Sequence, residues 1–545
     1  MKRLRSVLEL LKQYEPYFFG LAVLLNLLPL MTTQFFGSLD GPAHLYNAKV
    51  IGDLWFEEHN TLHEVFAINS SPVPNWLGHF LLVLFTRVLP DFMAEKALLV
   101  FCLVALCYSF RGIVLKQQPE ASGFSYFIFP FTYSMFFCLG FYNFMIAVAI
   151  AFKSFSIWIN FIHHKFKLRD YIFLFLLLLS CYFSHVFVFM LLIACVICYT
   201  TLYQLQAIIQ NPTIKKGFIK LYLKQLIIFL SIGAIPIIFC LDFLLHRDEG
   251  SERQYASMHE LKNWLSEFAP LSGFLHQDEM PYHYIFALCL LLLLLFGGFS
   301  HLKHILRSSK IKQNLILKIS HPSNTWLLVS MVLLLMYFYY PNIEGGAGFV
   351  SLRVLFLSLL FFTIWVLLLK ANKWLLLIVI PTLFFCRYQT ALLHVKVLNQ
   401  VGEVASDFYK LGKHIKPHSV VLTIDVKTNW MYGHFTNYLG LKNPVVLLDN
   451  YECESNYFPV QWNVNDLPNS TFGEIEAGEL LCLKWKSDIA HKARTIDYVL
   501  VNGSLTNMKD SCQLQILPTL NQYYTLVSSS INYELFGLKI KHGVN

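Results

Sequence analysis

The stretch that decides the fold is residues 17–46, YFFGLAVLLNLLPLMTTQFFGSLDGPAHLY. It begins with an apolar run, Tyr17–Leu30, and ends in a short polar segment around Asp40. A helical span of a bilayer needs about 20 apolar residues, and comparable apolar runs recur along the chain as far as Cys386. The stretch therefore predicts a first membrane span that leads into a loop outside the bilayer.

The composition points the same way. The chain has 545 residues, of which 56% are hydrophobic and only 14% are charged, whereas soluble domains carry about 25% charged residues. This excludes an ordinary cytosolic enzyme, a disordered protein and a nucleic-acid binder. The basic start, Met1–Arg5, is not followed by a small-residue cleavage site, so the first run is interpreted as an uncleaved span.

The chain divides by composition into two parts. After residue 395 the long apolar runs give way to regular charges, Asn and Gly. We predict a membrane body, residues 1–390, and a soluble domain, residues 391–545. In the soluble domain, short β-branched runs predict strands and a helical period covers Val397–His414, which together indicate an α/β domain. The predicted strands are Val420–Ile424, Pro444–Leu448, Tyr498–Val501 and a closing hairpin of Tyr523–Val527 with Asn532–Lys539.

Basic residues in short loops mark the cytoplasmic side of a membrane protein. Long apolar segments are predicted to break near Gly140–Asn143 and Ser184–His185, and Trp76–Leu89 is predicted to be an interfacial helix. With these breaks, the basic loops give about eleven spans. The prediction is a multi-pass plasma (inner) membrane protein with a cytoplasmic N-terminus and a periplasmic or extracellular C-terminal domain.

Asp40 lies just past the outer end of the first span. Partial desolvation there disfavours the charged carboxylate and strengthens it as a base. The pair Gly41–Pro42 predicts a turn, and helical spacing over Ala43–Ile51 brings His44 near Asp40. Asp40 has two compatible interpretations: a general base, or a helix N-cap that accepts backbone N–H groups.

A Gly-rich outer loop, residues 341–353, ends in Arg353 at the mouth of a span. A guanidinium binds phosphate through paired hydrogen bonds, although an interfacial Arg also extends toward lipid headgroups. His185 lies at a predicted outer helix break, and polar residues at membrane depth are often functional. Arg353 and His185 are therefore candidates for binding a phosphate.

The topology of residues 10–390, with the motifs Leu39–His44 and Pro74–His79, resembles the GT-C class of membrane glycosyltransferases. That class includes protein mannosyltransferases and the bacterial aminoarabinose transferase of lipid A. The chain also resembles a group of uncharacterised bacterial membrane proteins through Asn450-Tyr451-Glu452 and Tyr457-Phe458-Pro459. The resemblance implies a polyprenyl-phosphate-linked sugar donor, a glycan, lipid or protein acceptor on the outer face, and inverting transfer with Asp40 as the general base.

The chain departs from the class at two points. Many members carry two adjacent carboxylates in this loop, whereas Gly41 follows Asp40; many also carry a carboxylate where this chain has Asn143. We therefore assign no metal ligands, although a divalent metal stays possible as a cofactor. Asp40 and His44 are the predicted catalytic residues, and Glu344, Asn143 and Trp76 are the predicted substrate-binding residues.

Two alternatives remain open at the level of sequence. The first is a non-catalytic scaffold with a GT-C-like body, which the missing second carboxylate allows. The second is a transporter of lipid or polysaccharide. The predicted spans carry few charges at their centres, and no inverted repeat with matching broken helices is evident. These features favour the glycosyltransferase over the transporter.

Overall fold

The computed structural model describes the chain except for residues 1, 165, 211–214, 247–252, 307–310, 345–346, 370–372, 427–428, 456, 464–495, 504–517, 519 and 540–545. The fold has two compact units. The first, here called the helical unit, comprises Met1–Met31 and Val100–Lys396. The second, the mixed unit, comprises Thr32–Leu99 and Val397–Asn545, so the first predicted outer loop belongs to the same unit as the C-terminal residues.

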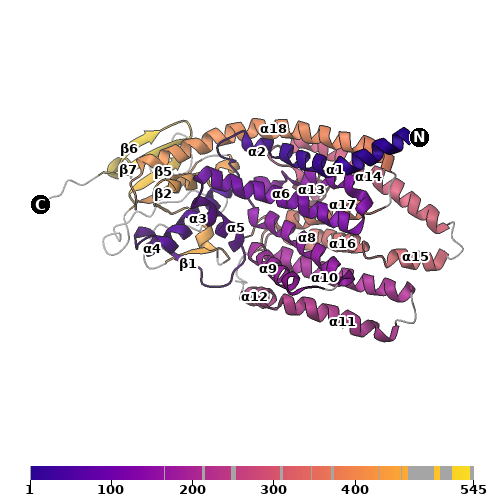
Figure 1. Cartoon of the computed structure of the whole chain (residues 1–545). Helices are drawn as coiled ribbons and strands as arrows, with labels where there is room; N and C mark the ends of the chain where they lie inside the picture. The colour runs from indigo at the N-terminus through magenta and orange to yellow at the C-terminus, as the bar shows by residue number, and fades with distance from the viewer. Residues whose placement is uncertain are drawn as a thin grey trace. The chain divides into compact units, whose positions relative to one another are not determined.

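The helical unit is built from α-helices (Figure 1), with 3₁₀ helices between some of them. Two helices, α6 and α18, continue into the mixed unit. The elements are α1 (Lys2–Asn26), α2 (Leu28–Met31), α6 (Asp91–Gln117), η1 (Pro119–Phe131), α7 (Met135–Cys138), α8 (Tyr142–His163), α9 (Leu168–Ser184), α10 (Val186–Gln210), α11 (Lys215–Ile232), α12 (Ala234–Leu245), α13 (Met258–Ser266), η3 (Ala269–Leu271), α14 (His276–Leu306), α15 (Ile311–Ile319), α16 (Asn324–Tyr339), α17 (Val350–Leu367), η4 (Lys373–Leu375) and α18 (Leu376–Leu411).

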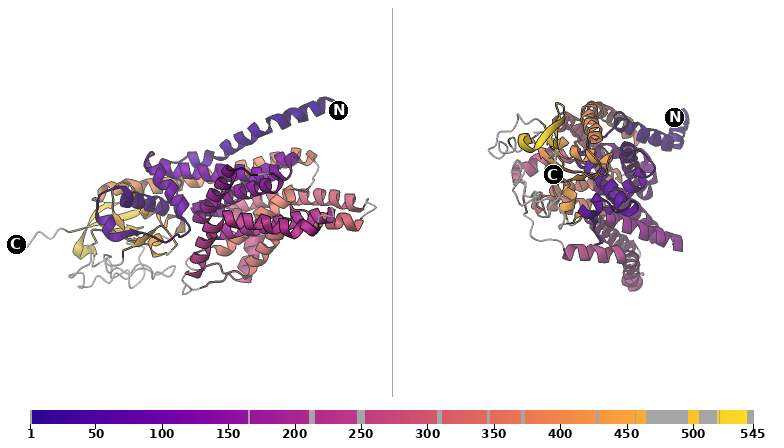
Figure 2. Two further views of the ribbon diagram at one scale, coloured as in Figure 1. Left: turned by 60° about the horizontal axis from the view of Figure 1, so that its bottom comes forward. Right: turned by 90° about the vertical axis from the view of Figure 1, so that its left-hand side faces the viewer.

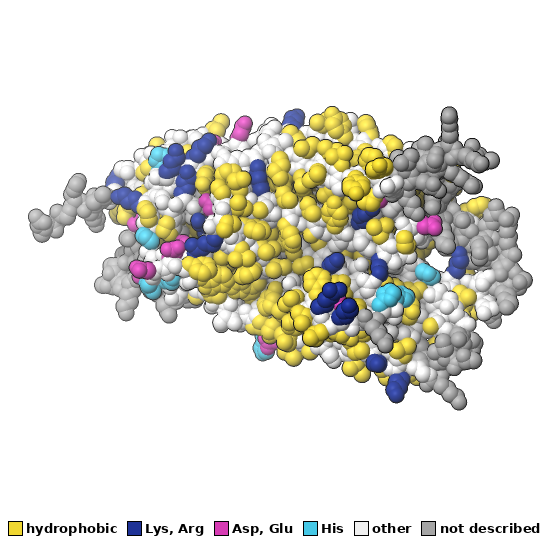
Figure 3. Space-filling view, in the orientation of Figure 1, with side chains coloured by type: hydrophobic (Ala, Val, Ile, Leu, Met, Phe, Trp, Pro, Cys, Tyr) yellow, Lys and Arg dark blue, Asp and Glu magenta, His cyan; other side chains and the backbone are white. Residues whose placement is uncertain are grey.

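Several of these helices are long and apolar enough to cross a membrane. Among the described residues there are six, in α6, α8, α10, α14, α17 and α18, or up to eight if the bent pairs α11–α12 and α15–α16 each count as one span. On α14, Leu288, Leu291 and Leu295 form an exposed stripe, 47–57% accessible, and hydrophobic side chains cover much of the face in Figure 3. The chain is a polytopic helical membrane protein.

The count of six to eight is below the predicted eleven, for local reasons. Residues predicted to continue a span form the 3₁₀ helix η1 and the single turn α7. Pro130 inside η1 has no backbone N–H to donate, and Gly140 after α7 has a φ of +89°. In addition, α9 has 17 residues, somewhat short of the ~20 that a span requires.

Both predicted helix breaks are present. The helix α8 begins at Tyr142, directly after the turn at Gly140. The helix α9 ends at Ser184 and α10 begins at Val186, so His185 lies between them in extended backbone, with φ −162° and ψ 115°. These breaks bring polar side chains to the ends of otherwise apolar helices.

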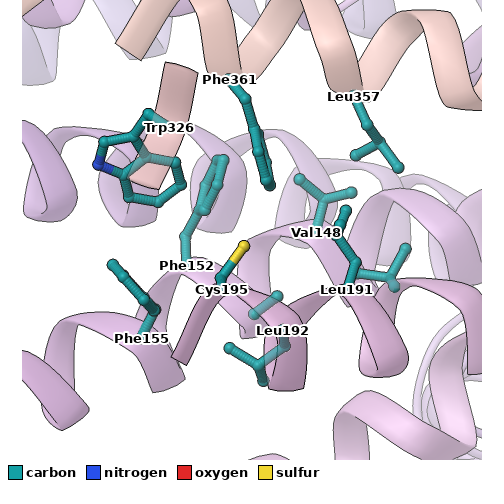
Figure 4. A pocket seen from close by; sticks show the side chains of 11 residues that line it. Val148, Phe152, Phe155, Leu191, Leu192, Cys195, Trp326, Leu357 and Phe361 are labelled. Atoms are coloured by element: carbon teal, nitrogen blue, oxygen red, sulfur yellow. The ribbon is translucent and has the colours of Figure 1, made fainter. Parts of the chain in front are cut away.

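Within the helical unit, α16 and α17 pack closely through small residues. Ser330 and Ser358 each donate a hydroxyl hydrogen bond of 2.9 Å to the other's backbone carbonyl, as small polar residues do between membrane helices. An apolar cavity lies among α8, α10, α16 and α17 (Figure 4). None of its lining residues is charged, so it suits hydrocarbon rather than a sugar phosphate.

The mixed unit contains a five-stranded sheet in the order β3-β2-β5-β7-β6. Strand β2 is parallel to β3 and β5, whereas β5–β7 and β7–β6 are antiparallel; the β6–β7 hairpin is yellow in Figures 1 and 2. The strands are β2 (Val420–Asp425), β3 (Val446–Leu447), β5 (Tyr498–Asn502), β6 (Tyr524–Ser529) and β7 (Tyr533–Leu538). All five predicted strands are confirmed, and the predicted helix is the end of α18 with η5 (Gly412–His414).

The rest of the mixed unit comes from both of its chain segments. Its remaining elements are α3 (Gly41–Phe56), α4 (Thr61–Val65), β1 (Phe66–Ile68), α5 (Trp76–Thr86), η6 (Trp430–Tyr432), η7 (Phe435–Leu441), η8 (Tyr451–Glu454) and β4 (Val460–Trp462). Strands β1 and β4 pair antiparallel, with the rings of Phe66 and Trp462 stacked 4.9 Å apart. This second sheet, which the sequence analysis did not predict, joins the segment 32–99 to the C-terminal segment.

A close approach between α3 and η7 fixes the core of the mixed unit. The buried Tyr46 hydroxyl donates a hydrogen bond of 2.7 Å to Val445 O and accepts one of 3.2 Å from Leu447 N. A Cβ at Gly440 would collide with the Tyr46 ring. We expect Gly440→Ala to destabilise the protein by about 1–3 kcal/mol through overpacking, measured as a lower unfolding midpoint in detergent.

The matched control for this prediction is Gly52→Ala on the same helix as Tyr46. There the nearest atom to a new Cβ is Arg87 Nη2 at 3.7 Å, an ordinary contact, and Ala favours a helix over Gly. An unfolding midpoint for Gly440→Ala equal to that of Gly52→Ala would contradict the packing described here.

Candidate functional site

Asp40 occupies the N-cap position of α3, but its side chain does not cap the helix. The backbone carbonyl of Asp40 accepts from His44 N at 3.0 Å, while its carboxylate makes no capping hydrogen bond. Instead, Ser38 Oγ accepts from Gly41 N at 3.1 Å, and Pro42 favours the first helical turn. The carboxylate is mostly buried, and its Oδ1 lies 3.6 Å from His434 Nε2.

Next to this pair lies a buried His–Glu–His cluster formed by His44, Glu452 and His79. His44 Nδ1 is 2.5 Å from Glu452 Oε1, and His79 Nε2 is 2.8 Å from Glu452 Oε2. The Glu452 and His79 side chains are 0% exposed, and that of His44 is 7% exposed. Burial alone would raise the pKa of Glu452, but His79 and His44 outweigh it and hold that pKa at about 2. Glu452 is therefore an ionised carboxylate in the interior.

Polar and aromatic neighbours fix the cluster in place. Asn47 and Asn450 exchange side-chain hydrogen bonds of 2.9 and 2.6 Å, which tie α3 to the start of η8. The Phe458 ring lies 6.2 Å from the His44 ring and 6.0 Å from the His79 ring, centroid to centroid. These contacts tie α3 to η8 and pack the Phe458 ring against the two imidazole rings that bind Glu452.

His434 and Tyr451 form the side of the site nearest Asp40. Their rings stack 4.5 Å apart at 29°. Burial lowers the pKa of His434 to about 4, so its imidazole is neutral at pH 7. Burial, followed by the negative charges of Asp40 and Glu452, raises the pKa of Tyr451. His434 and Tyr451 therefore place a neutral imidazole and a neutral phenol beside the Asp40 carboxylate.

The predicted phosphate ligands lie together in the helical unit. Arg353 Nη1 is 3.3 Å from His185 Nε2, and Arg353 Nη2 donates 2.8 Å to Gly348 O. The guanidinium carbon lies 4.3 Å from the centre of the Phe141 ring. The preceding residues Gly345 and Gly346 lie outside the described part of the chain.

The three predicted substrate-binding residues fall in different places. Asn143 is buried in the first turn of α8. Glu344 forms an ion pair with Arg253, with 3.2 Å between Glu344 Oε1 and Arg253 Nε. Asn143 and Glu344 both belong to the helical unit. Trp76 begins α5 in the mixed unit and stacks on Trp55, with centroids 6.0 Å apart at 7°. Asp40, His44 and Trp76 thus belong to the mixed unit, and the other four predicted residues belong to the helical unit.

The sequence analysis did not identify His79, His434 or Glu452 as site residues. Signals for two were present, because His79 closes the motif Pro74–His79 and Glu452 closes Asn450-Tyr451-Glu452. A further cluster in the helical unit was also missed: Glu279 Oε2 is 3.1 Å from His394 Nε2 and accepts from Gly273 N at 2.8 Å. Both clusters join residues that are distant in sequence.

The fold and these side chains define a polytopic helical membrane protein whose mixed unit carries a buried His–Glu–His cluster. No family model and no curated protein matches the chain. It is similar to two crystal structures of ArnT from Cupriavidus metallidurans. The apo structure aligns at 10% identity with a TM-score of 0.49, covering 96% of this chain and 97% of that one. The structure bound to undecaprenyl phosphate aligns at 8% identity with a TM-score of 0.47, covering 96% and 98%. Similarity at this level does not define the activity of this chain.

Proposed function

We propose that the chain is a GT-C-type glycosyltransferase that moves a sugar from a polyprenyl-phosphate-linked donor to an acceptor on the outer face of the membrane. The observation that carries this proposal is the Asp40 carboxylate, which sits at the start of α3 without capping it and beside the neutral imidazole of His434. The sequence resemblance to the GT-C class, at the motif Leu39–His44, supports the same function.

The proposed reaction is a single displacement. Asp40 takes the proton of the acceptor hydroxyl as the acceptor oxygen bonds to the anomeric carbon. The bond from that carbon to the donor phosphate oxygen breaks, and its electron pair leaves with the phosphate. The anomeric configuration is inverted because attack and departure occur on opposite faces. General-base assistance of this kind contributes about 10²–10⁴-fold to the rate.

The remaining predicted residues take supporting roles in this proposal. Arg353 and His185 bind the departing phosphate, for which a guanidinium is well suited. Asn143, Glu344 and Trp76 contact sugar or acceptor. His44 is proposed to act together with Asp40, and Glu452 holds its Nδ1 inside the cluster. The proposed topology keeps about eleven spans, with the N-terminus in the cytoplasm and the C-terminal domain outside.

The direct test is transfer of labelled sugar from a polyprenyl phosphate donor by purified protein in proteoliposomes. Product that accumulates with inverted anomeric configuration supports the transferase. Donor that is bound but never consumed, over a panel of sugars and acceptors, supports the non-catalytic scaffold. Donor that moves between leaflets without chemical change supports the transporter.

Binding of the donor carrier can be tested separately at Arg353. We expect Arg353→Ala to weaken binding of undecaprenyl phosphate by about 10–100-fold, because a hydrogen bond to a charged group contributes about 1.5–3 kcal/mol. Arg353→Lys should recover part of this loss, since Lys keeps the charge but not the paired geometry. The measurement is a titration in detergent micelles by microscale thermophoresis.

The control for this titration is Arg169→Ala, at an arginine whose side chain is 82% exposed in the helical unit. It removes the same charge from the protein without touching the Gly348 loop. Equal affinities for Arg353→Ala and Arg169→Ala would remove Arg353 from the proposed phosphate site.

A further inference from the structure

Three buried side chains from three segments of the mixed unit converge on one point. They are His44 from α3, His79 from α5 and Glu452 from η8. Their ligand atoms, one nitrogen from each ring and a carboxylate oxygen, all lie within 4.8 Å of one another. Two imidazoles and one carboxylate are a ligand set that proteins use for zinc, with a fourth position left for water or another ligand.

The spacing of the two rings already suits a shared ion. The His44 and His79 centroids are 5.0 Å apart, and the rings are nearly perpendicular, at 81°. Two imidazoles on one tetrahedral ion, with metal–nitrogen bonds of about 2.0–2.1 Å, have centroids roughly 5 Å apart. To hold an ion, the Glu452 carboxylate would have to move away from the rings, because its oxygens are 2.5 and 2.8 Å from the ring nitrogens and ligand atoms on such an ion are about 3.3 Å apart.

The Nδ1 atom of His79, which faces away from Glu452, has the kind of partner that is common in metal-bound histidines. His79 Nδ1 lies 3.0 Å from the backbone carbonyl oxygen of Asn75, one turn earlier in the chain. A ring that donates its Nδ1–H to a carbonyl presents the Nε2 lone pair on the opposite side, and metal-bound histidines are commonly fixed in this way. In His79 it is the Nε2 atom that faces Glu452.

The contact between His79 and Glu452 requires a positive partner. A ring nitrogen with a lone pair and a carboxylate oxygen repel each other at 2.8 Å unless a cation lies between them. A proton or a metal ion can meet this need. His44 can donate its own Nδ1–H to Glu452, so the need concerns His79. A divalent ion meets it and brings the buried charge from −1 to +1, whereas a single proton on His79 brings it to 0.

We propose that His44, His79 and Glu452 bind one first-row transition metal ion, with Zn²⁺ preferred. Imidazole nitrogen with a single carboxylate favours Zn²⁺ over Mg²⁺ or Ca²⁺, which take oxygen ligands. The ion holds α3, α5 and η8 together and so fixes the first turn of α3, which Asp40 directly precedes. Metal binding here does not depend on whether the chain is a transferase.

The first experiment uses the full-length protein, purified in detergent without chelators and without a histidine tag. We expect elemental analysis to find about one zinc per chain. After removal of metal with a chelator, Co²⁺ should restore one ion per chain and give the visible d–d absorption of a four-coordinate site. A zinc content below about a tenth per chain, together with no Co²⁺ absorption, overturns the proposal and assigns the bridging positions to protons.

The second experiment locates the ion with Glu452→Gln and His79→Gln, compared with His59→Gln, an exposed histidine of the same unit. We expect the first two variants to bind Co²⁺ at least about 100-fold more weakly and His59→Gln to match the unaltered protein. Unchanged Co²⁺ affinity in both cluster variants would place the metal elsewhere and overturn the proposal. The Co²⁺ titration of the unaltered protein decides the question even if a variant does not fold.

Discussion

Asp40→Asn is expected to lower the initial rate of sugar transfer by about 10²–10⁴-fold, the contribution of a positioned general base. Asparagine has the same shape but cannot take the acceptor proton. The protein should stay folded, because the Asp40 side chain makes no capping hydrogen bond to α3. Instead, Ser38 Oγ accepts the hydrogen bond from Gly41 N at the start of this helix. The rate is measured with a radiolabelled donor in proteoliposomes, alongside the thermal unfolding midpoint.

The matched control is Asp53→Asn, which makes the same chemical change on the same helix at a half-buried position. We expect Asp53→Asn to retain the transfer rate within a few-fold. Transfer at the normal rate by Asp40→Asn would remove Asp40 as the base. Loss of transfer in both variants would indicate that α3, rather than the Asp40 carboxylate, is needed.

The largest effect on stability is expected for Glu452→Ala. Removing one partner of a buried charged cluster typically costs about 3–5 kcal/mol, because the remaining groups stay buried without compensation. Here two histidines lose their shared acceptor, and a cavity is left where the 0% exposed side chain was. We expect a large fall in the unfolding midpoint, measured by intrinsic fluorescence in detergent.

Glu454→Ala provides the comparison, since Glu454 lies two residues along the same 3₁₀ helix with an exposed side chain. Its substitution should change stability by at most about 0.5 kcal/mol, as is usual at exposed positions. If both variants unfold at the same midpoint, the His–Glu–His cluster is not what holds η8.

The strands of the mixed unit could be predicted because their signal is local. Runs such as Val420–Ile424 and Tyr498–Val501 are rich in β-branched and apolar residues and bounded by polar ones, and they form the neighbouring interior strands β2 and β5. The helix breaks were predictable for the same reason, since Gly140 and His185 each interrupt an apolar run. In both cases a few neighbouring residues decide the backbone conformation.

The cluster could not be predicted in this way. Glu452 meets His44 across 408 positions and His79 across 373, and no periodicity connects residues so far apart. The short strand β1 was missed because Phe66–Ile68 gains its partner only from β4, far along the chain. One of the eleven predicted spans is not among the six to eight candidate helices of the described residues because hydropathy alone does not distinguish the 3₁₀ helix η1, interrupted by Pro130, from an α-helix.

The pairing of β1 with β4 bears on how the protein is made. Asn69, directly after β1, donates its side-chain amide to Phe458 O, 389 positions later. During translation, residues 32–99 are synthesised long before β4, the strand that pairs with β1. Most of the helices are synthesised, and must insert into the bilayer, between these two segments. The strand β1 therefore has no pairing partner, and its edge stays exposed, until the C-terminal segment with β4 has been synthesised. A truncated chain that starts near residue 391 would lack β1, α3 and α5, so it would reproduce neither the second sheet nor the His–Glu–His cluster.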